Sequence, residues 1–315
     1  MSSTIAATSP PPASSLATTP QRTKALDTLL WVLAGLSAAV SVLTPFVTTI
    51  SPYLFALTMT LTFTLAHGLR RYGWKTLLAF FVITFVISNS LENVSIATGF
   101  PFGHYHYTSP GPRVLQVPIF IGPFYFGLGY ISWLTASTIL DRADERLGTH
   151  HRVGRFNLVA LPVLAGAIMS MYDLGSDSMA STVNKVWMWH DGGGFFGVPY
   201  TNYLGWWFVC YAFFQVFALV LSRAQNRRPR PSHSITPGSL AQPIIVYGAL
   251  GVLSVSIFMT TTTGTAVDPT NTTWDLHAMT EALMTTNIFT TIVIAALGLF
   301  KIARGDLTTP LTLAR

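Results

Sequence analysis

Three acidic residues in apolar surroundings are the side chains of this sequence most capable of chemistry. Asp173 and Asp177 follow the apolar run Phe156–Met171, which is typical of a membrane helix, and Glu92 ends another apolar run. A carboxylate at or inside a membrane boundary is costly, so an ionisable residue placed there indicates a function. We therefore predict that Asp173, Asp177 and Glu92 are catalytic.

The spacing of the two aspartates favours acid chemistry. If the helix continues through Gly175, side chains four residues apart project from one face about one turn apart. Two like charges so close together, and partly removed from water, are not both ionised cheaply. One carboxyl then keeps its proton and is able to donate it at physiological pH. The alternative is that these side chains only cap a helix or bond to backbone.

Aromatic residues are dense around these carboxyls, in the segments 89–112 and 172–207. Aromatic faces attract cations, so a strong acid in an aromatic cage suits protonation of an alkene and stabilisation of the resulting carbocation. An interfacial aromatic belt is the alternative for part of this set. The candidate substrate-binding residues are Trp187, Trp189, Phe195, Phe196, Tyr107, Tyr105, Asn202, Trp206 and Phe102.

The sequence does not favour a metal or another cofactor. His104 and His106 form an H-x-H triplet, which could in principle join Glu92 at a metal. The spaced histidine clusters of membrane di-iron enzymes are missing, however, and the run DLGSD beginning at Asp173 is not the aspartate-rich box that holds magnesium in prenyl-diphosphate enzymes. We therefore expect no metal site and no cofactor.

Composition predicts an all-α, polytopic membrane protein. Half of the 315 residues are hydrophobic and only 10% are charged. About eight apolar segments approach the length of a membrane span, and seven spans are possible because the third and fifth are short. These segments are Leu26–Ile50, Pro52–Leu69, Thr76–Leu91, Val114–Leu140, Asn157–Asp173, Asn202–Ser222, Pro243–Thr263 and Ala282–Ile302.

The basic residues predict the orientation. With eight spans and a cytoplasmic N-terminus, 16 of the 18 lysines and arginines fall on the cytoplasmic side, leaving only Arg113 and Lys185 opposite. Both termini are therefore expected in the cytoplasm. The net charge of +6 is a topological signal, and nucleic acid is not an expected partner. The single cysteine, Cys210, gives no disulfide framework.

The chain divides simply. Residues 1–25, rich in Ser, Thr and Pro, are expected to be a disordered tail, 26–303 a single transmembrane catalytic domain, and 304–315 a short cytoplasmic tail. A tail of this composition suggests a eukaryotic protein, for which the endoplasmic reticulum or another endomembrane is the expected location. The segments 89–112, 172–207 and 261–281 should meet on the non-cytoplasmic face as a pocket.

Two motif blocks carry a resemblance to a known family. The first is Glu92-Asn-Val-Ser-Ile-Ala-Thr-Gly-Phe-Pro-Phe-Gly-His-Tyr-His-Tyr-Thr, followed by Gln116-Val-Pro. The second is Tyr172-Asp-Leu-x3-Asp, Trp187-x-Trp and Gly193-Gly-Phe-Phe-Gly-Val-Pro-x-x-Asn-x-x-Gly-Trp. Across roughly Ala79–Ala218 the chain resembles the integral-membrane carotenoid biosynthesis family, which includes carotenoid 1,2-hydratases of the bisanhydrobacterioruberin hydratase type. Ser178 and Phe195 depart from the family pattern.

The resemblance implies a cofactor-independent enzyme that adds water to the terminal double bond of an acyclic carotenoid. From residue type, we predict Asp173 or Asp177 as the acid, and Glu92 or the other aspartate as the base. Asn202 and Tyr107 would orient the water. The expected partners are a hydrophobic polyprenoid, the lipid bilayer and other enzymes of the pathway.

Two other functions fit the same sequence. A departure from the family pattern is compatible with a proton-initiated terpene cyclase of secondary metabolism, in which an internal alkene replaces water and the pocket must keep water away. A non-catalytic carrier of lipid or carotenoid, or a scaffold for other enzymes, is the second alternative. Under that alternative, Asp173→Asn and Asp177→Asn would leave function intact.

Overall fold

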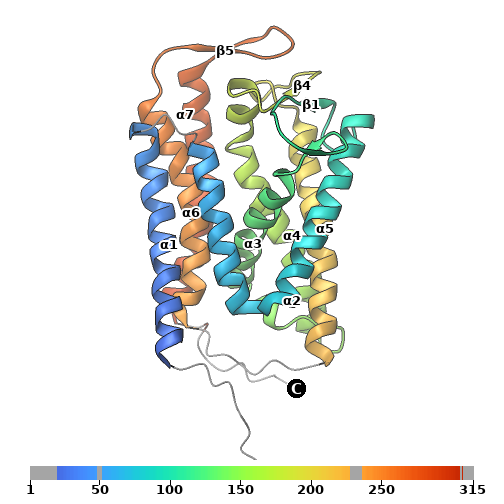
Figure 1. Ribbon diagram of the computed structural model, residues 1–315, viewed down its shortest axis with the longest axis vertical. Helices are drawn as coiled ribbons and strands as arrows, with labels where there is room; N and C mark the ends of the chain where they lie inside the picture. The colour runs from blue at the N-terminus through green and yellow to red at the C-terminus, as the bar shows by residue number, and fades with distance from the viewer. Residues whose placement is uncertain (1–19, 48–51, 228–235, 306, 308–315) are drawn as a thin grey trace, which may run out of the picture.

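The computed structural model describes residues 20–47, 52–227, 236–305 and 307, and it is a bundle of long helices with small strand pairs at one end (Figure 1). The helices are α1 Pro20–Val47, α2 Pro52–Thr98, α3 Ile121–Ile139, α4 Arg152–Leu174, α5 Tyr200–Arg227, α6 Pro237–Thr260, α7 Leu276–Asn287 and α8 Val293–Ala303. Short helices lie at Ala143–Glu145 (η1), Met179–Val183 (η2) and Ile288–Ile292 (η3), the last two being π-helical. The strands are β1 Tyr105–Tyr107, β2 Arg113–Val114, β3 Val117–Pro118, β4 Trp187–Trp189, β5 Thr265–Val267 and β6 Thr273–Asp275.

Helix α2 is two helices joined at a sharp bend. Gly73 has φ 75° and ψ 164°, a backbone conformation that is essentially restricted to glycine. Figure 1 shows the two halves of α2 running in opposite directions from this bend. They correspond to the second and third predicted spans, Pro52–Leu69 and Thr76–Leu91. The predicted order of apolar segments is therefore found along the described chain.

The helices are those of a multi-pass membrane protein. Within the described residues, six helical stretches are long and apolar enough to cross a membrane, with the two halves of α2 counted together. Their outer faces carry many exposed large apolar side chains, such as Leu65, Val86, Val159 and Leu297. A water-soluble protein would bury such side chains, whereas lipid accommodates them. The prediction of an all-α transmembrane bundle is confirmed.

Some element boundaries differ from the predicted ones. The segment predicted from Val114 begins as the strand pair β2–β3, and its helix, α3, starts only at Ile121. Proline accounts for the difference, because Pro118 cannot continue a helix, whereas Pro123 is tolerated in a first turn. At the N-terminus, α1 starts at Pro20, inside the stretch assigned to the tail. Residues 1–19 and most of 304–315 lie outside the described residues.

A buried polar cluster fixes the Gly73 bend to the connection between α3 and α4. Arg71 Nη2 lies 2.8 Å from Asp144 Oδ2, and the Tyr72 hydroxyl donates to the same oxygen over 2.5 Å. Ser137 also donates a hydrogen bond to Asp144. Burial alone would raise the pKa of Asp144, but the Arg71 guanidinium and these hydrogen bonds hold it below its usual range. The carboxylate is thus kept charged beside its buried partner.

The opposite end of the bundle holds the loops that the sequence predicts to meet. Strands β1 and β4 pair antiparallel, which joins the segment after α2 to the segment before α5. Strands β5 and β6 form a hairpin between α6 and α7, and Lys185 Nζ donates to the carbonyl of Val267 in that hairpin over 3.0 Å. All three segments therefore come together above the helices (Figure 1).

Candidate functional site

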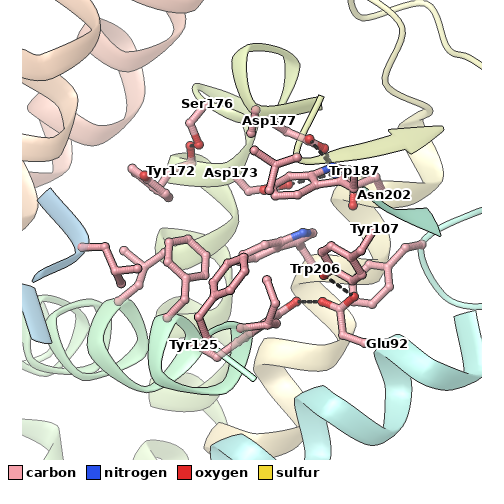
Figure 2. A pocket seen from close by; sticks show the side chains of 18 of the residues that line it. Glu92, Tyr107, Tyr125, Tyr172, Asp173, Ser176, Asp177, Trp187, Asn202 and Trp206 are labelled. Atoms are coloured by element: carbon pink, nitrogen blue, oxygen red, sulfur yellow. Dashed lines mark hydrogen bonds between the residues drawn. The ribbon is translucent and has the colours of Figure 1, made fainter. Parts of the chain in front are cut away.

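A cavity of about 370 Å³ lies beneath these loops, enclosed by side chains from α2, α3, α4, α5, α6, β1 and β4. It is lined mainly by apolar and aromatic side chains with a few convergent polar groups, as small-molecule sites generally are. Figure 2 shows its polar residues in two groups on opposite sides. Ten of the predicted site residues line it, namely Glu92, Phe102, Tyr105, Tyr107, Asp173, Asp177, Trp187, Trp189, Asn202 and Trp206.

The first polar group joins Asp173 and Asp177 through one amide. Asn202 Nδ2 donates to Asp173 Oδ2 over 2.9 Å and to Asp177 Oδ2 over 2.6 Å. Trp187 Nε1 donates to the other oxygen of Asp177 over 2.9 Å. No hydrogen bond to the second oxygen of Asp173 occurs within the described residues, and this residue lines the cavity. Asp173 is thus the aspartate with a carboxyl oxygen still available to a ligand.

The backbone brings the two aspartates together in a different way from the one predicted. Helix α4 ends at Leu174, residues 175–176 form a turn, and the chain is helical again at 177–178 before the π-helix that starts at Met179. At Gly175 a side chain would collide with Asn287 of α7, whose Nδ2 donates to the Gly175 carbonyl over 2.9 Å. Asn287 therefore holds the turn in place. The two aspartates meet at Asn202 on α5 rather than along one continuous helix.

The second polar group is Glu92 with three tyrosines. Glu92 accepts hydrogen bonds from Tyr125 over 2.8 Å, from Tyr107 over 3.0 Å and from Tyr105. Strand alternation places Tyr105 and Tyr107 on the buried face of β1, while His106 between them faces outward. Burial and the Glu92 carboxyl raise the pKa of both β1 tyrosines, so their phenols remain protonated donors.

The three carboxyls are buried without a cation. Glu92 is 4%, Asp173 3% and Asp177 1% exposed, and none of them forms an ion pair with a basic side chain of the described chain. An uncompensated buried charge costs several kcal/mol, whereas a protonated carboxyl does not carry that cost. Any of these carboxyls that is ionised is therefore stabilised by hydrogen-bond donors and not by a cation. Of the side-chain donors described above, Glu92 accepts from three, Asp177 from two and Asp173 from one.

Aromatic rings form the wall between the two polar groups. Trp206 stacks on Tyr125 with ring centroids 4.8 Å apart and an interplanar angle of 15°. Trp189 packs on Tyr105 at 4.8 Å, and Trp187 meets Tyr107 edge-on at 6.0 Å. Each polar group therefore has aromatic rings beside it, and the faces of such rings attract cations.

Two predicted substrate-binding residues lie elsewhere. Phe195 and Phe196 do not line the cavity; they pack with Trp274 and Met279 in a separate cluster under the β5–β6 hairpin. The exposed His106 lies with its Nδ1 2.7 Å from His190 Nε2, also away from the cavity. Among the described residues, no three His, Cys, Asp or Glu side chains lie close enough together to hold a metal ion.

Sequence reasoning missed Tyr125. This residue lies inside the apolar run that forms α3, and its phenol reaches Glu92 while its ring supports Trp206. In a helix buried on nearly all sides, periodicity does not distinguish the cavity face from the other faces. The residue type itself carries a signal, because the hydroxyl of a buried tyrosine needs a hydrogen-bond partner. A tyrosine in such an apolar run therefore indicates a polar group nearby.

Comparison with known proteins identifies the family. The family model described as "Carotenoid biosynthesis protein" matches residues 49–267, which is more than two thirds of the 315 residues. The matched region includes every residue of both polar groups. No curated protein and no solved structure matches the chain. The chain belongs to the carotenoid biosynthesis protein family.

Proposed function

We propose that this protein is a membrane hydratase, which protonates the terminal alkene of an acyclic, carotenoid-like polyprenoid and captures the tertiary carbocation with water. One observation carries the proposal: Asp173 and Asp177 share the Asn202 amide inside an aromatic-walled cavity of a membrane bundle. Family membership supports a role in carotenoid metabolism and a hydrocarbon substrate.

Asp173 is the proposed proton donor. Its Oδ2 accepts the Asn202 hydrogen bond, so the oxygen that is not engaged carries the proton and faces the ligand. In the first step the O–H bond breaks, and the alkene π electrons form a C–H bond at the less substituted carbon. The positive charge then lies on the tertiary carbon, which is the more stable cation. Asp173 is left as a carboxylate that the Asn202 amide stabilises.

Asp177 is the proposed charged partner. Two N–H donors, from Trp187 and Asn202, hold one oxygen each, which is the pattern of an ionised carboxylate. The negative charge of Asp177, together with the ring faces of Trp187 and Trp189, stabilises the positive charge of the carbocation. Water then forms a C–O bond at the tertiary carbon, and the proton it loses goes to the Glu92 carboxylate on the side from which the water attacks. Proton exchange with solvent after product release returns Glu92 to its carboxylate and Asp173 to its acid, so the net reaction is the addition of one water molecule.

Glu92 and its tyrosines are the proposed water-positioning group. Tyr105, Tyr107 and Tyr125 occupy three acceptor sites of this carboxyl, and about four lone-pair directions exist on a carboxylate. A water molecule at the remaining position would approach the cation from the side opposite to Asp173 (Figure 2). This role refines the sequence prediction in which Glu92 acts as the base.

The test is product identification in heavy-oxygen water. Membranes containing the protein are incubated with acyclic carotenoids and with shorter acyclic polyprenoids, and the products are analysed by mass spectrometry. A product that is heavier by one labelled water supports hydration. An isomeric product without label would instead support a proton-initiated cyclase. Absence of any conversion, with the protein present in the membrane, would support the carrier alternative and contradict both enzymes.

A further inference from the structure

The cavity opens at an apolar part of the protein surface. Among the residues that line it, the two most exposed are Leu54, at 60%, and Phe120, at 37%, and both are hydrophobic. Leu54 belongs to the first half of α2, and Phe120 is the residue immediately before α3. Leu57 and Phe124, one turn further along each helix, are half-buried and also line the cavity. We call these four residues the rim.

The rim is bounded by direct helix packing on one side. About two turns beyond Leu57 along α2, the hydroxyl of Thr64 donates to the carbonyl of Gly127 on α3 over 3.2 Å. At that level a side chain of α2 lies directly against the backbone of α3. At the level of the rim, by contrast, the side chains that line the cavity are themselves exposed or half-buried. Side chains change rotamer within nanoseconds in exposed positions, so this is the part of the wall that opens most easily.

The surface outside the rim suits lipid rather than water. Val114, Leu115 and Ile119, which precede α3, are exposed hydrophobic residues next to Phe120 in the chain. The loops that cover the cavity at the end of the bundle are polar by comparison, with exposed His104, Lys185 and Asp191. A hydrocarbon dissolved in the bilayer therefore meets a matching apolar surface at the rim.

The volume of the cavity limits what enters. A cavity of about 370 Å³ is near the lower end of the roughly 300–1,000 Å³ that holds a drug-sized ligand. It therefore accepts the end of a long polyprenoid but not the whole chain. Resting on the proposed function, we infer that the polyprenoid enters sideways from the bilayer, end first, through the rim between α2 and α3. The remainder of the chain stays in lipid during the reaction.

The chain offers a clean labelling test of this route. Cys210 is fully buried, so a cysteine introduced at the rim is the intended target of a maleimide. Phe120→Cys and Leu54→Cys are each treated in membranes with a bulky, lipid-soluble maleimide, and turnover is compared with the untreated membranes of the same variant. Leu65→Cys is the matched control, because Leu65 is exposed on the same half of α2 but does not line the cavity.

The inference predicts that labelling at position 120 or 54 lowers turnover about tenfold or more, since entry is blocked, whereas labelling at position 65 leaves the rate unchanged. Unchanged turnover in fully labelled Phe120→Cys and Leu54→Cys membranes would overturn the rim as the route.

A second measurement does not depend on turnover, so failure of the proposed function is distinguishable from failure of the route. An acyclic carotenoid added to the membranes should slow maleimide labelling of Phe120→Cys, because the bound chain lies across the rim. It should not slow labelling of Leu65→Cys. Equal labelling rates of Phe120→Cys with and without the carotenoid would contradict the route, even if the wild-type protein hydrates its substrate.

Discussion

Replacing Asp173 by asparagine separates chemistry from folding. The amide oxygen of the new residue still accepts from Asn202 Nδ2, which lies 2.9 Å from Asp173 Oδ2, and the side chain keeps its size. The free energy of unfolding should therefore change by less than about 1 kcal/mol. What is lost is the proposed acidic proton on the oxygen that does not accept from Asn202. General acid catalysis contributes about 10²–10⁴-fold to rate, so turnover should fall by about that factor.

Asp177→Asn is the matched comparison. Two donors, Trp187 Nε1 at 2.9 Å and Asn202 Nδ2 at 2.6 Å, bond to different oxygens of Asp177. An amide has only one oxygen, so one N–H donor would face an NH₂ group, which costs about 1–3 kcal/mol. Asp177→Asn should therefore lower stability as well as turnover, whereas Asp173→Asn lowers turnover alone.

The assay measures both quantities on the same membranes. Product formation from an acyclic carotenoid gives turnover per folded protein, and thermal unfolding of the detergent-solubilised protein gives stability. Asp173→Asn that keeps more than about a third of the wild-type turnover would refute the assignment of this residue as the acid. A large loss of stability in Asp173→Asn would refute the argument that the asparagine oxygen keeps the hydrogen bond from Asn202 Nδ2.

Three further predictions concern the scaffold. Gly73→Ala should cost about 1–3 kcal/mol in a thermal unfolding measurement, because φ 75° and ψ 164° are restricted to glycine, while Gly35→Ala within α1 should be neutral or stabilising. Asp144→Asn should cost about 3 kcal/mol in the same measurement, because it removes the carboxylate that pairs with buried Arg71. Burial alone would raise the pKa of Asp268 in the β5–β6 hairpin, but hydrogen bonds from Thr270, Trp274 and Thr272 outweigh burial, so the pKa is lowered. Its stabilising effect is therefore present above the unfolded pKa of about 3.9 and is lost as pH falls through the lower folded value. The hydrogen-exchange protection of residues 265–275, relative to the intrinsic exchange rate at each pH, should therefore fall below about pH 4 in the wild type and change less with pH in Asp268→Asn.

The sequence was informative where a residue type is costly in its surroundings. Carboxylates in apolar runs pointed to Asp173, Asp177 and Glu92, and all three line one cavity. Composition and the length of apolar runs were enough to predict the helical membrane bundle, because the bilayer restricts what crosses it. The bend at Gly73 was anticipated only as a boundary between two runs, since a lone glycine does not reveal its φ angle.

The sequence was uninformative where long-range contacts decide the geometry. Phe195 and Phe196 lie beside the Gly turn in the chain, but contact with Trp274, about 80 residues away, draws them into another cluster. The turn at Gly175 depends on Asn287 from α7, which no local pattern indicates. Tyr125 was hidden because α3 is buried on almost every side.

The central claim is that a carboxylic acid of this protein protonates a carbon of the substrate. Turnover of an acyclic carotenoid in deuterated water, with mass spectrometry and NMR of the product, tests it most directly. The account predicts one deuterium bonded to the carbon next to the newly substituted tertiary carbon, and about 10²–10⁴-fold slower formation of this product with Asp173→Asn. A converted product without carbon-bound deuterium would contradict protonation of the alkene.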